Sequence, residues 1–140
     1  LVNASLFISV FHTTYDAQTR ELRYSNAGHN PPFVVRADQP GKRDLNTEGM
    51  LVGLMPDWTP EEIAITLTAG DVFVMYTDGI IETTNATDEL YGETRLVDLV
   101  RANCARPAKE IIQVVLDDVA RWCNNEPLKD DATLMIMRVV

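Results

Sequence analysis

The strongest hydrophobic pattern in the chain is an unbroken apolar run near its middle. The run covers residues 72–76, Val-Phe-Val-Met-Tyr, between Gly70 and Gly79. A short continuous run that contains β-branched and aromatic residues and is bounded by turn residues is typical of a strand buried on both faces. We therefore predict an interior strand, with Asp78 and Gly79 where it emerges into a loop. The Asp-Gly pair has two interpretations: a common turn dipeptide, or a carboxylate held rigidly for chemistry.

Other apolar segments predict further strands. Residues 6–14 are apolar in both alternations, which favours an interior strand, and residues 21–25 form the second arm of a hairpin with it. Residues 132–140 are again apolar on both faces. Three more segments are predicted as strands: residues 32–37, a polar edge segment around 43–47, and residues 62–67, where alternate positions are apolar.

Helical spacing appears after the central strand. The segment 91–96, Tyr-Gly-Glu-Thr-Arg-Leu, leads into a helix with four residues on one side: Leu96, Leu99, Val100 and Asn103. A stronger helix starts at Pro107, an allowed first helical residue, and ends at Asn124 and Asn125. Its apolar stripe consists of Ile111, Val115, Val119 and Trp122.

The connections between strands determine the expected architecture. Most of them are too short for the crossover that parallel strands need, so the sheets should be mainly antiparallel. Several strands are nevertheless apolar on both faces, which a sheet with one wet face would not require. Two antiparallel sheets packed face to face, with helices outside, reconcile both observations. We predict an α+β fold, an αββα four-layer sandwich.

Composition narrows the function classes. The chain of 140 residues has 12 basic and 21 acidic residues and a formal net charge of −9, which argues against nucleic-acid binding because no basic stripe is present. Bound cations could still bring phosphate to an acidic site. No apolar run approaches the ~20 residues of a membrane span. Cys104 and Cys123 have no second Cys or His at ligand spacing, so we expect buried free thiols in a reducing, cytoplasmic compartment, and a disulfide is the alternative.

Carboxylates mark two strand ends. Asp78 follows one buried strand, and Asp130 and Asp131 precede another. In antiparallel neighbours, the end of one strand lies beside the start of the next, so these residues can meet. Clustered like charges repel unless a cation lies between them, and oxygen ligands suit Mg²⁺ or Mn²⁺. The alternative is two unrelated turn aspartates.

A loop between two predicted strands holds a second candidate. Residues 26–32 read Asn-Ala-Gly-His-Asn-Pro-Pro. His29 either hydrogen-bonds within its own loop or takes part in a site.

Four motifs in one order carry a family resemblance: Asn-Ala-Gly-His-Asn-Pro-Pro at 26–32, Gly-Asp to Thr-Asp-Gly at 70–79, Tyr-Gly-Glu-Thr-Arg-Leu at 91–96, and Asp-Asp-Ala-Thr at 130–133. From about residue 6 to residue 140 the chain resembles the bacterial SpoIIE-like (RsbU-like) serine phosphatases. These are a branch of the metal-dependent PPM, or type 2C, phosphatases. The resemblance implies the αββα fold and hydrolysis of phosphoserine or phosphothreonine on a protein with two Mn²⁺ or Mg²⁺ ions.

The resemblance also implies residue roles. Asp78 and Asp130 match the family's metal-binding, catalytic aspartates, and Asp131 would orient its neighbour. Gly79 and the loop residues Asn26, Gly28 and His29 would line the site. The family's first metal motif, Gly-Asp-x-x-Gly-His-Gly, has no match here. We therefore expect residues 1–140 to be the C-terminal part of one phosphatase domain, with the missing motif before Leu1 and weak or absent activity in the fragment.

Partners follow from the same resemblance. The implied substrate is a phosphoserine protein, a STAS-domain anti-sigma factor antagonist, and the implied neighbour is an upstream sensor or receiver domain. A homodimer is one open arrangement, because a truncated sheet exposes an edge. The competing hypothesis is a catalytically inactive phosphatase-like module that binds a signalling partner. A small-molecule hydrolase is disfavoured, because neither a nucleophile elbow nor a His-rich zinc motif is present.

Overall fold

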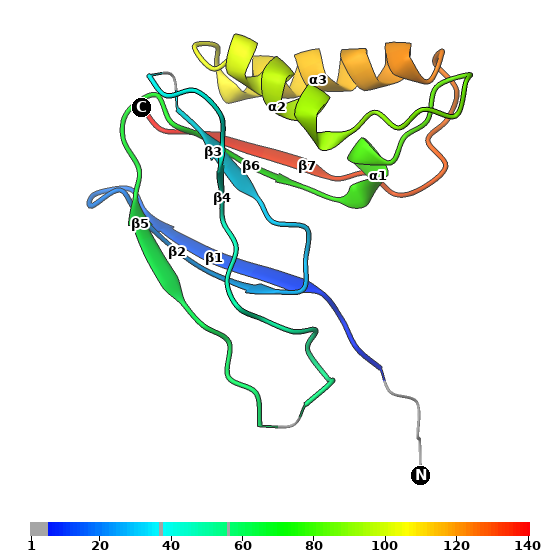
Figure 1. Cartoon of the computed structure of the whole chain (residues 1–140). Helices are drawn as coiled ribbons and strands as arrows, with labels where there is room; N and C mark the ends of the chain where they lie inside the picture. The colour runs from blue at the N-terminus through cyan, green and yellow to red at the C-terminus, as the bar shows by residue number, and fades with distance from the viewer. Residues whose placement is uncertain (1–5, 37, 56) are drawn as a thin grey trace. The chain divides into compact units, whose positions relative to one another are not determined.

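The computed structural model describes residues 6–36, 38–55 and 57–140 (Figure 1). The chain divides into two compact units, the first formed by Leu1–Pro31 and Leu45–Thr68, the second by Pro32–Asp44 and Ala69–Val140. The first unit contains one antiparallel sheet, and the second contains another sheet with all the described helices. This is the predicted α+β class with two antiparallel sheets.

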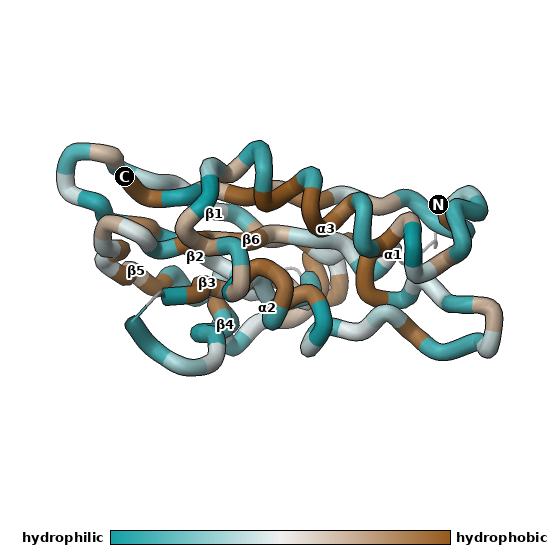
Figure 2. The backbone as a smooth tube through the Cα atoms, turned by 90° about the horizontal axis from the view of Figure 1, so that it is seen from above, coloured by the Kyte–Doolittle hydropathy of each residue, from teal (hydrophilic) through white to brown (hydrophobic). Residues whose placement is uncertain are grey.

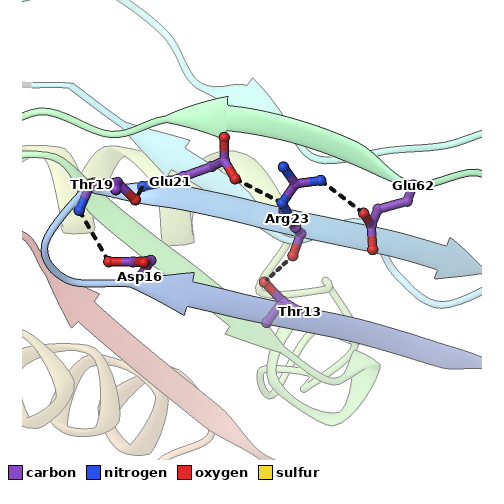
Figure 3. Close-up of polar contacts among 6 residues, drawn as sticks. All are labelled: Thr13, Asp16, Thr19, Glu21, Arg23 and Glu62. Atoms are coloured by element: carbon purple, nitrogen blue, oxygen red, sulfur yellow. Dashed lines mark hydrogen bonds and ion pairs between the residues drawn. The ribbon is translucent and has the colours of Figure 1, made fainter.

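The sheet of the first unit has the order β1-β2-β5, formed by β1 (Val10–Asp16), β2 (Glu21–Ala27) and β5 (Ile63–Thr66). The predicted hairpin is present, with Asp16 paired to Glu21 and Val10 to Ala27. Figure 3 shows its turn, where Asp16 Oδ1 accepts the backbone N–H of Thr19 at 3.0 Å. The same oxygen accepts the backbone N–H of Gln18 at 2.7 Å. Both N–H groups hold the pKa of the Asp16 carboxyl below its ordinary value, and the N–H of Thr19 has the larger effect.

The prediction for the first strand was wrong in position and burial. The strand β1 spans Val10–Asp16 instead of 6–14, and its side chains alternate between exposed and half-buried. Within the described residues it pairs only with β2, so it is an edge strand of that sheet. Ile8 instead forms an isolated bridge with Val52. The reason is that the turn after Asp16 sets the hairpin register, which the apolar pattern alone does not report.

The sheet of the second unit has the order β4-β3-β6-β7. Its strands are β3 (Phe33–Val35), β4 (Arg43–Asp44), β6 (Val72–Tyr76) and β7 (Leu134–Arg138). The central prediction is confirmed: β6 lies between β3 and β7, and all its residues but Met75 are buried. The edge position of β4 is also confirmed among the described strands. Ala37, at the end of one predicted strand, lies outside the described residues.

The predicted burial of both faces of the last strand was wrong. Within β7 only Ile136 is buried, and Met135 is 44% exposed. In the part of the chain that the structure describes, β7 is the last strand of its sheet, and α3 packs against it. A strand in that position is covered less completely than the central strand, although the two sequences are similarly apolar.

Helices α1 (Asp78–Ile81), α2 (Glu93–Ala102) and α3 (Ala108–Trp122) belong to the second unit. In Figure 2, α3 alternates between hydrophobic and hydrophilic segments, as an amphipathic helix does. Ile111, Val115 and Val119 are buried in the core with residues of β3, β6, α1 and α2, and Trp122 packs at its border. The helix ends as predicted, because Asn124 and Asn125 adopt φ values of 54° and 61°. None of the described helices is both long and apolar enough to cross a membrane.

Val115 tests the assignment of the buried face. Its side chain has no exposed surface, whereas the adjacent Leu116 is 42% exposed. Val115→Asp would place an unpaired charge in the core, and we expect it to lower the free energy of unfolding by roughly 3–5 kcal/mol. Leu116→Asp is the matched control and should cost less than about 1 kcal/mol. Urea unfolding measures both, and equal midpoints for the two variants would contradict the assignment.

A polar cluster joins α2 to α3. Asp118 Oδ2 accepts hydrogen bonds from the Tyr91 hydroxyl at 2.9 Å and from Arg95 Nε at 3.0 Å, and Arg121 donates to Oδ1 at 3.1 Å. The Arg95 guanidinium also lies 4.3 Å from the centre of the Trp122 ring. Burial pushes the pKa of Asp118 upward, but these hydrogen bonds outweigh it, so the pKa lies below its ordinary value.

This lowered pKa predicts how stability depends on pH. A carboxyl with a lowered folded pKa adds stability above its unfolded pKa of ~3.9, and that stability is lost as pH falls through the folded value. We expect Asp118→Asn to reduce the free energy of unfolding at neutral pH by about 1–2 kcal/mol. The difference from the parent should shrink as the pH approaches about 3. Urea unfolding across this pH range, with Asp117→Asn as control, measures it, and a difference that does not change with pH would contradict it.

Candidate metal centre

The ends of β6 and β7 bring the predicted acidic segments together. The last register pair of these antiparallel strands joins Tyr76 to Leu134. Beyond it, Thr77 N–H donates to the Thr133 carbonyl at 3.1 Å, and Thr133 N–H donates to Thr77 Oγ1 at 2.9 Å. Asp78 therefore follows the same junction that Asp130 and Asp131 precede.

Gly79 allows these segments to approach closely. A Cβ atom at this position would lie 2.3 Å from the carbonyl oxygen of Asp131 and 3.2 Å from Cα of Ala132. The first turn of α1 thus packs directly against the backbone that precedes β7, and only glycine leaves room for that contact. The close approach explains why Gly follows Asp78, whereas its predicted place in a site remains a prediction.

The three aspartates are exposed and carry uncompensated charge. Asp78 Oδ1 accepts the Gly79 N–H at 3.0 Å, and Asp130 Oδ1 accepts the Asp131 N–H at 2.8 Å. Among residues 6–36, 38–55 and 57–140, no ion pair involves any of the three carboxylates. One backbone contact thus orients each of Asp78 and Asp130 and leaves its second oxygen available.

The donor chemistry fits Mg²⁺ or Mn²⁺, which prefer carboxylate oxygen. The number of ligands is smaller than a closed site needs. Within the described ranges, no group of three or more His, Cys, Asp or Glu residues could hold a metal ion. These residues could therefore supply part of a metal site, and further ligands would have to complete it.

The Asn26–His29 loop belongs to the first unit. Asn26 is buried; its Oδ1 accepts the His29 N–H at 2.8 Å and its Nδ2 donates to the His29 carbonyl at 3.0 Å. His29 Nδ1 lies 2.9 Å from the Asn30 carbonyl oxygen. Gly28 has a φ of 72°, which favours glycine. The structure thus shows that His29 hydrogen-bonds within its own loop, which is one of its two predicted interpretations. A site-lining role for Asn26, Gly28 and His29 stays a prediction.

The Tyr-Gly-Glu-Thr-Arg-Leu segment holds the end of β6. Glu93 Oε1 accepts the Tyr76 hydroxyl at 2.6 Å and Lys42 Nζ at 2.8 Å. Burial pushes the pKa of Glu93 upward, but the hydrogen bonds from Lys42 and Tyr76 outweigh it and lower the pKa. Glu93 therefore stays ionised and anchors Tyr76, two residues before Asp78. The sequence marked residues 91–96 as a motif, but only the structure shows that Glu93 contacts Tyr76.

A cavity beside the junction was not predicted. It has a volume of ≈ 470 Å³ and is lined by Gly79 and Asp130 together with residues of the loop after α1 and of the segment between α3 and β7. These loops carry no periodic hydrophobic pattern, so nothing in the sequence predicted that they line one cavity. Cys123 borders the cavity as a buried free thiol, as expected, whereas Cys104 is a free thiol that is only half-buried, so the predicted burial of Cys104 was wrong.

Known proteins resemble the chain over nearly its whole length. The chain is 27% identical over 137 residues to the phosphoserine phosphatase RsbU of Bacillus subtilis, and the match covers 98% of this chain and 40% of RsbU. A crystal structure of RsbU and RsbW domains from Mycobacterium tuberculosis superposes with a TM-score of 0.77 at 28% identity, over 98% of this chain and 37% of that one.

The manganese-soaked SpoIIE phosphatase domain of B. subtilis gives a TM-score of 0.69 at 20% identity, over 94% of this chain and 56% of that domain. The chain thus spans less than two thirds of each of these relatives. The family model described as stage II sporulation protein E (SpoIIE) matches residues 1–140. The chain therefore belongs to the SpoIIE family and has the fold of its PP2C-type phosphatase domains.

Proposed function

We propose that this chain contributes metal ligands to a protein serine/threonine phosphatase domain that hydrolyses phosphoserine on a regulatory protein. The observation that carries the proposal is the β6–β7 junction, where the backbone segments that carry Asp78 and Asp130–Asp131 come together, with no ion pair of these aspartates among the described residues. The name of the B. subtilis relative, a phosphoserine phosphatase, supports the choice of substrate.

The roles of the residues follow from their contacts. Asp78 and Asp130 would each offer a carboxylate oxygen to a shared Mn²⁺ or Mg²⁺ ion. The N–H groups of Gly79 and Asp131 orient these carboxylates, as outer contacts of a metal site commonly do. When bound, such ions neutralise phosphoryl charge and activate water. A two-ion centre requires further ligands, and the manganese-soaked SpoIIE domain supports divalent-ion dependence of the complete domain.

The expected biological setting is also part of the proposal. We infer that the substrate is a STAS-domain anti-sigma factor antagonist and that a sensor or receiver domain controls the phosphatase. The M. tuberculosis structure contains both RsbU and RsbW domains, which supports a phosphatase that acts together with a signalling partner. Free thiols at Cys104 and Cys123 fit a cytoplasmic location. A homodimer remains a prediction, supported by exposed apolar residues before β1: Leu6, Phe7 and Ile8.

The test uses the full-length protein that carries this chain. After removal of divalent ions with EDTA, the protein is incubated with phosphoserine proteins and peptides, with and without added Mn²⁺ or Mg²⁺. The proposal expects phosphate release that requires the added ion. Because the described residues contain no three-ligand group, a non-catalytic module that binds a phosphorylated partner is the second candidate. Binding without phosphate release under all these conditions would favour that candidate.

A further inference from the structure

We propose that the cavity beside the β6–β7 junction binds residues next to the phosphoserine of the substrate and selects a basic side chain among them. This inference rests on the proposed phosphatase function. It adds a substrate feature that the function alone leaves open.

The cavity adjoins the proposed metal site. Gly79 and Asp130 belong to its wall, and the rest comes mainly from residues 82–86 and 126–129. Its volume of ≈ 470 Å³ lies within the range of small-ligand pockets, roughly 300–1,000 Å³. An extended peptide advances about 3.3 Å per residue, so residues close to a phosphoserine held at Asp130 would reach it.

The charge of the cavity wall is strongly negative. Four carboxylates line it, those of the proposed metal ligand Asp130 and of Glu82, Asp88 and Glu126, so three remain beside the ion against the single ammonium group of Lys129. In the portion of the chain that the structure describes, none of these four carboxylates has an ion-pair partner. Lys129 Nζ donates instead to Thr84 Oγ1 at 3.1 Å. A concave wall with a net negative charge concentrates the potential and attracts a cation.

The arrangement fits an organic cation better than a metal ion. Among the described residues no three acidic side chains come close enough to hold a metal, so the charges surround the cavity without converging on a point. Arginine or lysine has a long apolar stem and a charged end. Pro127 and Leu128 offer apolar contact to such a stem, and the carboxylates offer acceptors to its end.

One wall of the cavity is preformed. Asn85 Oδ1 accepts the backbone N–H groups of Thr87 at 2.9 Å and of Glu89 at 3.0 Å. Trp122 Nε1 on α3 donates to the Glu89 carbonyl at 3.2 Å. The loop after α1 is thus held to itself and to α3, which reduces the entropy that binding would cost.

The experiment measures hydrolysis of matched phosphopeptides by the full-length protein with Mn²⁺. Each peptide carries phosphoserine among alanines, with one Arg, Gln or Glu placed in turn at each of the neighbouring positions. We expect Arg at one or two positions to raise kcat/KM roughly 3–10-fold over Gln. The preference should weaken as salt rises from about 50 to 300 mM.

Variants of the cavity wall provide the controls. Glu82→Gln with Glu126→Gln should lower kcat/KM on the Arg peptide to the value on the Gln peptide, and Glu126→Lys should favour the Glu peptide. Glu110→Gln with Asp117→Asn removes the same charge from α3 outside the cavity and should keep the preference. Equal hydrolysis of Arg and Gln peptides at every position, or a preference that survives in the cavity variant, would overturn the inference.

Peptide binding separates this inference from the function on which it rests. Fluorescence anisotropy gives the affinity of labelled Arg and Gln phosphopeptides without requiring turnover. Hydrolysis without an Arg preference refutes the cavity assignment alone. An Arg preference in binding, lost in the Glu82→Gln and Glu126→Gln variant but without hydrolysis of any peptide, refutes the phosphatase function alone. Absence of both hydrolysis and preferential binding refutes the two together.

Discussion

Asp130→Asn is expected to abolish metal-dependent phosphate release by the full-length protein while the fold remains intact. Loss of an outer contact in a metal site typically costs 10–100-fold in affinity or activity, so loss of a proposed ligand should cost at least about 100-fold. Asp78→Asn should have the same effect. Stability should stay equal or rise slightly, because each change removes one charge from a group of exposed aspartates without ion-pair partners among the described residues.

The measurement combines phosphate release, Mn²⁺ titration and urea unfolding. Asp131→Asn should give an intermediate loss, roughly 10–100-fold, because its backbone N–H still orients Asp130. Asp117→Asn, an exposed change on α3, serves as the control and should retain full activity. Normal turnover in both Asp78→Asn and Asp130→Asn would identify these residues as ordinary turn aspartates and end the metal-site proposal.

Gly79→Ala should be the most disruptive single-methyl change near the junction. The new Cβ would lie 2.3 Å from the Asp131 carbonyl oxygen, so the backbone of α1 or of the segment before β7 must move. We expect a loss of about 3 kcal/mol in the free energy of unfolding, at the upper end of overpacking costs. The movement would also separate Asp78 from Asp130, so Mn²⁺ affinity should fall.

Gly70→Ala is the informative comparison for this change. Gly70 has a φ of 92°, but a Cβ added there would meet no atom within 4 Å beyond its chain neighbours, so its substitution costs backbone strain without a clash. That strain should cost about 1 kcal/mol and leave Mn²⁺ affinity unchanged. Chemical denaturation and Mn²⁺ titration distinguish the two variants. A Gly79→Ala protein as stable as Gly70→Ala would show that the close approach is not required.

Several elements could be predicted because their own residues determine them. The apolar run of β6 needs cover on both faces wherever it lies, and the stripe Ile111, Val115 and Val119 needs one buried side of a helix. The hairpin followed from turn chemistry between two strand patterns. The order of the four motifs indicated the family, which the match over residues 1–140 confirms.

The contacts between distant segments could not be predicted in this way. Residues 6–14 and 132–140 look as apolar as the central strand, yet β1 and β7 lie at sheet edges among the described residues and expose part of their surface. An apolar pattern shows that a side chain can be buried, but the number of neighbouring strands depends on how the chain pairs. The cavity beside Gly79 was missed for a related reason, because its loops follow no period.

The central strand, the amphipathic helix, the hairpin and the acidic residues at two strand ends could all be predicted from the residue pattern. Three contacts emerge only from the folded chain: Gly79 lies against the Asp131 backbone, Glu93 accepts a hydrogen bond from Tyr76, and two loops without periodic pattern line an acidic cavity. The difference lies in the distance along the chain over which each interaction is set. The period of buried side chains is a property of a single helix or strand. The three contacts instead require backbones that are distant in sequence to come within a few ångströms of one another, and only the packing of the folded chain sets those positions.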